Sequence, residues 1–269
     1  SDRSVAGAPV TSGAASGFDL DVSTLQSGDP ITLSVRGPGG VERTLTLIRV
    51  DSAAALPLAG VATAQAGTMV GIDFSGGMAS VATQISTALG SGFAVSSPAA
   101  STLRVLDDGA AGATDVTGLS AAATQTNPLG GDVGLALFVD AGNGVAARTF
   151  TGSFEGGPQQ TGFSGRIAVN PAVLNDASLL VRTSSTTQAG DPARPQALLS
   201  RMTEGMGRFA TIGGNVSGVY SGTVSGLIRT NMDAQAASVA EAEGMDEGQQ
   251  IVVASLRERF AEVSGVSVD

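Results

Sequence analysis

The sequence predicts an α+β protein, in which a β-rich antiparallel module with one covering helix is joined to a mainly α-helical segment with long coiled-coil-like helices. Three observations predict this class. The chain has 269 residues, enough for one large domain or two ordinary ones. Apolar residues recur mostly with period 2 from residue 18 to about residue 148, and mostly with a helical period after residue 162. We therefore expect a linker at 1–17, a β-rich outer module at 18–161 and a mainly helical segment at 162–269.

The first seventeen residues are small and polar without a period, which is a composition typical of linkers. Strands are expected next, at Phe18–Val22, Ile31–Arg36, Thr44–Val50, Val70–Phe74, Phe93–Ser97, Thr102–Leu106, Leu135–Val139 and Val145–Phe150. Pro38-Gly39-Gly40 predicts a hairpin loop between two of them, because it supplies a fixed φ and then permissive glycines. One helix is expected at Met78–Leu89, with Gly90 as its stop signal. Its apolar stripe, which is more typical of a core than of a partner groove, is Met78, Val81, Ile85 and Leu89.

The pattern changes after residue 162. Ile167–Val169 predicts a short strand, Asn170-Pro171 a turn, and Pro171–Asn175 one helical turn. A further helix is expected from Asp191, as N-cap, and Pro192, at the first helical position, to about Phe209.

The last block, Ser221–Val263, contains no Pro and predicts a long helix or a pair of helices. Its heptad pattern places Val224, Asn231, Ser238, Met245, Val252 and Arg259 at one position, and Ile228, Gln235, Ala242, Gln249, Leu256 and Val263 at the other. Seven of these twelve are apolar, which favours packing against other helices or subunits over an ordinary solvated helix. Gly244 and Gly248 are the places where a break is expected if there is one, since interior glycine costs about 1 kcal/mol.

The composition excludes much of enzyme chemistry. The chain has no Cys, His, Trp or Lys, and therefore no thiol, imidazole or lysine for catalysis and no thiolate or imidazole metal site. We expect no enzyme, no catalytic residue, no cofactor and no metal. The net charge of −10 opposes nucleic acid and anionic membrane as partners, and no run of apolar residues is long enough for a transmembrane helix.

Three motifs have a chemical interpretation and a simpler one. Gly142–Ala147 fits the G-x-G-x-x-A dinucleotide fingerprint, but β-branched and aromatic residues follow where a phosphate site needs a helix, so a hairpin turn at Asn143-Gly144 is favoured. Asp107-Asp108-Gly109, and Asp140 with Asn143, are candidate calcium ligands; side chains bonding their own turns are the favoured interpretation. A glycosidase with paired carboxylates is disfavoured because aromatics are only 4% of the chain.

Three stretches resemble one family. Gly162–Val181 (GFSGRIAVNPAVLNDASLLV) resembles the G-x-I-x-V-N-P-x-L-x-x-D-P segment of the hook-associated protein 1 family, the junction proteins between the hook and filament of bacterial flagella. Asn170, Pro171 and Asp176 match that motif. Val173 stands at the position of its Leu, with Leu174 next to it, and Ala177 replaces its second Pro. Leu137-Phe138 is similar to the L-F that precedes it. The ending S-G-V-S-V-D at 264–269 is similar to the S-G-V-N-L-D that follows a long helix in this family, and the resemblance extends over residues 132–269.

The resemblance implies an extracellular structural subunit that joins hook to filament and has no catalytic residue. It implies export by the flagellar secretion apparatus without a cleaved signal peptide. The implied partners are other copies of the chain, hook protein, hook-associated protein 3 and an export chaperone for a C-terminal region not included here. Terminal helices that the sequence lacks are expected to polymerise and to pair with the helical segment. Two alternatives stay open: a flagellin-like or hook-associated protein 3-like axial subunit, and an extracellular calcium-binding adhesin module.

Overall fold

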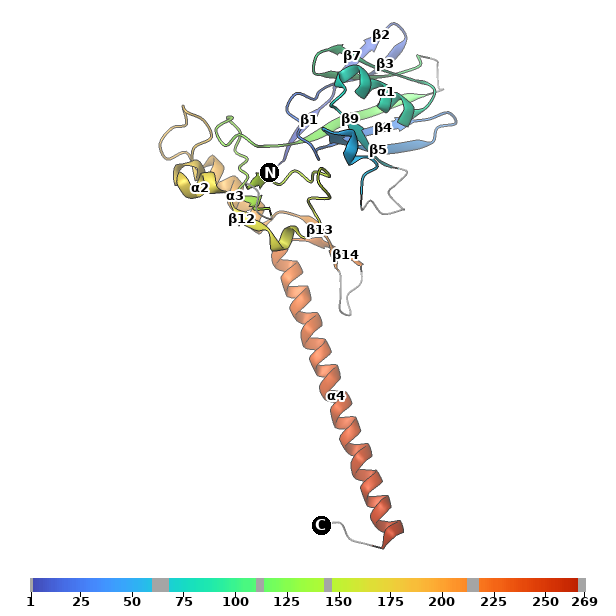
Figure 1. The fold of residues 1–269 in the computed structure, drawn as a ribbon, viewed down its shortest axis with the longest axis vertical. Helices are drawn as coiled ribbons and strands as arrows, with labels where there is room; N and C mark the ends of the chain where they lie inside the picture. Colours follow the sequence, from blue (N-terminus) through green and yellow to red (C-terminus); the bar gives the residue numbers. More distant parts are fainter. Residues whose placement is uncertain (1, 60–67, 110–113, 143–146, 212–217, 266–269) are drawn as a thin grey trace. The chain divides into compact units, whose positions relative to one another are not determined.

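The computed structural model of the chain describes residues 2–59, 68–109, 114–142, 147–211 and 218–265. It is a mixed structure of several sheets and helices, so the α+β class fits (Figure 1). The chain divides into two compact units, Ser1–Pro195 and Gln196–Asp269. The boundary expected at 161/162 lies inside the first unit.

The first unit opens with nine strands among its described residues: β1 Asp2–Ala6, β2 Ala8–Ser12, β3 Ala15–Asp21, β4 Pro30–Arg36, β5 Glu42–Val50, β6 Met69–Asp73, β7 Phe93–Ala99, β8 Thr102–Asp107 and β9 Asp115–Thr124. They form a five-stranded sheet, in the order β1-β9-β4-β5-β6, and a four-stranded sheet, in the order β2-β3-β8-β7. All pairs are antiparallel except β5 with β6. A 3₁₀ turn, η1 (Ala53–Ala55), follows β5. The predicted loop Pro38-Gly39-Gly40 is confirmed: it joins β4 to β5, with φ of 84° at Gly39 and 80° at Gly40.

One hydrophobic cluster draws residues from both sheets and from the predicted helix. That helix is α1 (Gly77–Leu89), and it connects β6, at the edge of the larger sheet, to β7, at the edge of the smaller one. The cluster includes Leu33 and Leu47 from the larger sheet and Leu20 and Val105 from the smaller. Helix α1 adds the predicted stripe: Val81, Ile85 and Leu89 are buried, and the partly buried Met78 packs against the cluster. The interpretation of the stripe as core is confirmed.

The prediction of a linker at 1–17 is wrong, because β1 pairs with β9 and β2 pairs with β3 there. Both are edge strands with largely exposed side chains, held by main-chain hydrogen bonds, so they need no apolar alternation. Gly7 joins the two strands, and its N–H donates to the carbonyl of Leu119 at 2.8 Å. A Cβ at Gly7 would lie 2.6 Å from that same oxygen, so the crossing requires glycine.

Strand β9 is a second feature that the periodicity missed. It is ten residues long and lies between β1 and β4. Its sequence, DVTGLSAAAT, is rich in alanine and interrupted by Gly118, and residues 118–123 include none of the β-branched or aromatic residues typical of strands. The small side chains of Ala121 and Ala123 are nevertheless buried in the core.

The rest of the first unit is a smaller region of short elements. Strand β10 (Phe138–Asp140) pairs with β11 (Arg148–Thr149) and β12 (Ile167–Val169), so the strand expected at Leu135–Val139 begins later than predicted. The following elements are η2 (Phe163–Gly165), α2 (Pro171–Asn175), η3 (Ala177–Leu180) and the start of α3 (Ala193–Thr203). The predicted strand at 167–169 and the predicted helical turn at 171–175 are confirmed.

Arg194 explains why residues 162–195 belong to the first unit. Its side chain is fully buried, and its guanidinium donates to main-chain carbonyls of two separate segments. One segment contributes Pro128 and Asp132, each at 2.7 Å, and the other contributes Leu179 at 2.8 Å together with Arg182. Burial lowers the pKa of Arg194, but a guanidinium stays protonated in proteins. A buried cation satisfied by carbonyls on both segments holds them together as one body.

The second unit contains the remainder of α3, the hairpin of β13 (Gly207–Thr211) and β14 (Gly218–Gly222), and α4 (Val224–Ser264). The helix expected to continue to Phe209 ends at Thr203, and Phe209 instead pairs with Tyr220 across the hairpin. Gly205 and Gly207 lie at this change, where helix propensity is low. Helix α4 runs unbroken through Gly244 and Gly248, so the last block is one helix rather than a pair.

Candidate functional site: the exposed face of helix α4

Helix α4 has well-formed ends. Thr223 is its N-cap, and the Thr223 hydroxyl accepts a hydrogen bond from the Gly226 N–H at 3.1 Å. At the other end Gly265 adopts the left-handed conformation, and its N–H donates to the Ala261 carbonyl at 3.0 Å. The 41 residues between these caps extend about 60 Å, at 1.5 Å per residue.

None of the described residues of α4 is buried. The apolar members of its two heptad positions, which we call the seam, are Val224, Ile228, Ala242, Met245, Val252, Leu256 and Val263. Their larger side chains are 49% exposed at Val224, 61% at Leu256 and 90% at Val263. Phe260, which is 68% exposed, lies beside the seam, because it is one turn beyond Leu256. The heptad pattern passed over Phe260, whereas the straight-helix period of 3.6 finds it.

Burial of this face by a partner would release substantial free energy. A fully buried Val, Leu, Ile, Met or Phe side chain contributes about 1.5–3 kcal/mol relative to an exposed one. The larger side chains of the seam together represent roughly 10 kcal/mol of unused burial, as an upper bound. Most helical stability in proteins comes from packing an amphipathic face, and Gly244 and Gly248 each remove about 1 kcal/mol from the intrinsic stability of α4. The described residues provide no such packing for α4, since none of its side chains is buried.

The charges of α4 are also unevenly placed. Four acidic residues lie together near its middle: Glu241, Glu243, Asp246 and Glu247. Near its C-terminal end Arg257 and Arg259 alternate with Glu258 and Glu262. No ion pair forms within the described part of α4, so these charges are open to a partner. Four exposed apolar residues of α4 lie outside the two heptad positions: Met232, Val239, Ile251 and Val253. Ile251 lies about 140° around the helix from Leu256.

The residues that carry the family resemblance cap two short helices and bond neighbouring main chain. Asn170 is the N-cap of α2: its side-chain oxygen accepts from the Ala172 N–H at 2.9 Å, and its Nδ2 donates to the Ala136 carbonyl at 2.8 Å. Pro171 occupies the first turn of α2, and Asp176 caps η3 by accepting from the Ser178 N–H at 3.0 Å. These side chains position main chain, and none is arranged for chemistry. The C-terminal residues 266–269 of the resemblance lie outside the described residues.

Two of the aspartates considered as calcium ligands, Asp107 and Asp140, bond their own turns. Asp107 is buried, and its carboxylate accepts from the Gly109 N–H at 2.8 Å and from the Ser16 N–H and hydroxyl. Asp140 accepts from the Gly142 N–H at 3.0 Å and forms an ion pair with Arg166 at 2.9 Å. These bonds confirm the turn interpretation for both residues.

The ion pair also sets the charge state of Asp140. The Arg166 guanidinium, followed by the Gly142 N–H, lowers the pKa of Asp140 to about 2. Asn143 and Gly144 lie outside the described residues, so the predicted turn stays a prediction. On its far side the chain continues as the strand β11 at Arg148, where a dinucleotide site would need a helix.

Two buried polar side chains had no signal in the sequence. Arg194 is one, and Gln159 is the other: its Oε1 accepts from the N–H groups of Thr151, Gly152 and Ser153 at 3.0 to 3.3 Å. Both side chains form hydrogen bonds with main-chain groups, and a pattern of side chains in the sequence does not predict such bonds.

In the described part of the chain, no group of three or more acidic side chains is placed to hold a metal ion. No helix there is long and apolar enough to cross a membrane. Comparisons with protein-family models, with curated proteins and with solved structures found no significant match.

Proposed function

We propose that the chain is an extracellular structural subunit of the bacterial flagellum, of the hook-associated protein 1 kind, which joins hook to filament by packing. The observation that carries this proposal is the seam of α4, an apolar face along a capped helix with no buried residue among those described. Export by the flagellar secretion apparatus with the help of a chaperone belongs to the same proposal.

The seam makes the mechanism one of assembly. Helices of neighbouring copies, in coiled-coil-like packing, would cover the apolar residues of α4 and bring basic groups to the acidic middle of the helix. Contacts with hook protein and hook-associated protein 3 would then fix the junction at its two ends. No catalytic group, cofactor or metal takes part.

The resemblance at 162–181 and 264–269 supports the junction protein over the related axial subunits, flagellin and hook-associated protein 3. Gly265 adds to this, because the glycine of the S-G-V ending stands where the long helix stops. Asn170 and Asp176, the matching polar residues of the other stretch, are both helix caps, so their spacing has a structural cause.

The test introduces charge into the seam. Ile228→Asp with Leu256→Asp, in the full-length protein in its own cells, should leave secreted but unassembled protein, lost motility and filament subunits in the medium. A desolvated carboxylate without a partner costs several kcal/mol. Ile251→Asp is the matched control on another side of the helix and should swim normally. Attached filaments and normal swimming in the seam variant would overturn the proposal.

A further inference from the structure

The side chains that oxidants attack most readily are unevenly distributed in this chain. Cys, His and Trp are absent and there is one Tyr, so the six methionines carry most of its sensitivity to oxidation. Four of the six are largely exposed, and all four lie in the second unit: Met202, Met206, Met232 and Met245. Met69 and Met78 are partly buried in the first unit. An oxidant that reaches the isolated chain therefore modifies the second unit first.

Met245 differs from the other three exposed methionines in its position. It belongs to the seam of α4, and at 100° per residue it lies within about 20° of Val252 and of Leu256 around the helix. Met232 is on the same helix but outside the two heptad positions, and Met202 is on α3. Met245 is 58% exposed and Met202 is 57% exposed, so the two side chains are equally open to a small oxidant in the isolated chain.

Oxidation would make this seam position polar. The thioether sulfur attacks one oxygen of a peroxide: an S–O bond forms, the O–O bond breaks, and the departing hydroxide takes the proton of the new S–OH group and leaves as water. The sulfur loses two electrons, which the peroxide gains. The sulfoxide oxygen is a hydrogen-bond acceptor, and its burial without a donor is unfavourable. Val252 and Leu256, its neighbours along the seam, have no side-chain donor.

We propose that Met245 is a regulatory oxidation site: a peroxide converts it to the sulfoxide in the unassembled chain, and the modified seam then packs poorly against its partner. The proposal rests on the proposed function, because a seam that nothing covers has no burial for a sulfoxide to oppose. Once a partner covers the seam, the same packing shields Met245. The site therefore responds to oxidant before assembly and not after it.

The accessibility of Met245 is tested on the isolated chain with dilute hydrogen peroxide. Peptide mass spectrometry should find that Met245 and Met202 are oxidised at rates within threefold of each other, and that both react at least fivefold faster than Met78. The difference follows from exposure, since the sulfur chemistry is the same at all three positions. Oxidation of Met245 as slow as that of Met78 would overturn the proposal, and this result depends on no partner.

The consequence for assembly is tested in the full-length protein in its own cells. Met245→Gln places a polar group of similar length in the seam and should reduce the number of attached filaments per cell at least threefold, whereas Met245→Leu should leave it unchanged. Met202→Gln is the control at equal exposure and should assemble as the parent does. Unfolding midpoints of the isolated variants establish that the fold is retained.

Normal assembly of Met245→Gln would overturn this proposal, and the charged seam variant shows whether the proposed function fails with it. If Ile228→Asp with Leu256→Asp also assembles normally, both fail. If that variant remains unassembled, the oxidation proposal fails alone.

A peroxide arm separates oxidation from polarity. At a dose that oxidises about half of Met202 in the secreted subunits, the parent should lose attached filaments at least twofold. Met245→Leu should keep them, because leucine forms no sulfoxide. Equal losses in the parent and in Met245→Leu would overturn the proposal. A parent that keeps its filaments while its secreted subunits carry the Met245 sulfoxide would overturn it as well.

Discussion

The β-rich region of the first unit and helix α4 use apolar residues in opposite ways. In the first, Leu33 and its neighbours are fully enclosed between two sheets and α1. In the second, residues of the same type line a capped helix, and Leu256 is 61% exposed. Burial of apolar side chains within the first region accounts for its stability. Helix α4 buries none of its described side chains, and this is the physical reason to look for a partner.

The largest loss of stability is expected on replacing Arg194, which links two segments of the first unit. Arg194→Met leaves carbonyls of two segments without donors inside the first unit, and we expect the free energy of unfolding to fall by roughly 3–5 kcal/mol. Arg201→Met, at an exposed position of the same helix, should change it by less than about 0.5 kcal/mol. Denaturant unfolding measures both. A loss below about 1 kcal/mol at Arg194 would contradict its role as the link between the segments.

A matched pair of leucines sharpens the comparison further. Leu33→Ala should cost about 2–5 kcal/mol, because it opens a cavity in the core. Leu256→Ala in the same isolated chain should stay within about 0.5 kcal/mol, since that side chain has little burial to lose. Equal losses in denaturant unfolding would show that α4 is already part of a core.

Acid should weaken the first unit through Asp140. Its pKa is about 2 in the folded chain, below the ordinary 3.8, so the carboxylate form is favoured by folding. This contribution is complete above about pH 4 and is lost as the pH falls toward 2. Unfolding of the parent and of Asp140→Asn, measured from pH 5 to 2, should differ most above pH 4 and converge toward pH 2. A difference that is constant over this range would rule out the Arg166 ion pair as its cause.

The smallest expected effect is in α4 itself. A Cβ at Gly244 or Gly248 would meet nothing within 4 Å beyond the helix's own backbone, so each change to Ala should stabilise the helix by about 1 kcal/mol. Slower hydrogen exchange in α4, with an unchanged melting transition of the β-rich region, is the expected result. Faster exchange would show that replacing the glycines destabilises α4, and would contradict this prediction.

The sequence predicted best where side chains alternate against a core. Helix α1, the hairpin of β4 and β5, and the long helix were all predicted from their apolar periods and turn residues. Strands β1, β2 and β9 were not predicted. Main-chain pairing and small residues stabilise them, and neither produces an alternation of apolar side chains in the sequence. Arg194 was missed for a related reason: its partners are carbonyls from distant segments, and the extent of the first unit follows from them.

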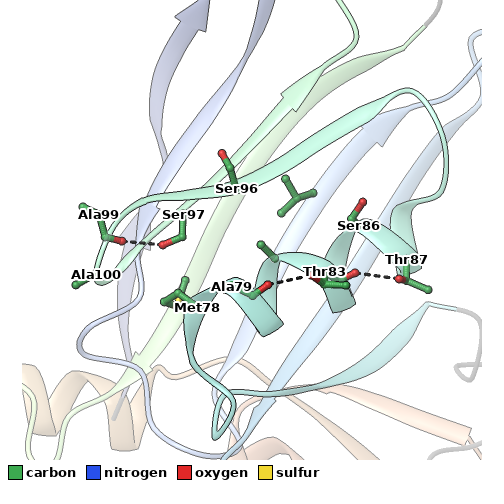
Figure 2. A pocket seen from close by; sticks show the side chains of 11 residues that line it. Met78, Ala79, Thr83, Ser86, Thr87, Ser96, Ser97, Ala99 and Ala100 are labelled. Atoms are coloured by element: carbon green, nitrogen blue, oxygen red, sulfur yellow. Dashed lines mark hydrogen bonds between the residues drawn. The ribbon is translucent and has the colours of Figure 1, made fainter.

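Of the candidate site, the sequence predicted the seam but not its surroundings. The heptad positions placed Val224 and Leu256 on one face, whereas the caps Thr223 and Gly265 were not predicted. Phe260 falls outside a strict repeat of seven. The groove between α1 and β7 (Figure 2) had no sequence signal, because small side chains scattered over both elements form it.

The central claim, that the seam of α4 is covered in the assembled protein, has a direct test. The chain contains no cysteine, so Leu256→Cys and Ile251→Cys each introduce a single reactive thiol. In the isolated chain both should react rapidly with a maleimide, since the parent side chains are 61% and 70% exposed. In assembled flagella we expect the thiol of Leu256→Cys to be protected at least tenfold more than that of Ile251→Cys. Equal labelling of the two in the assembled state would contradict the claim.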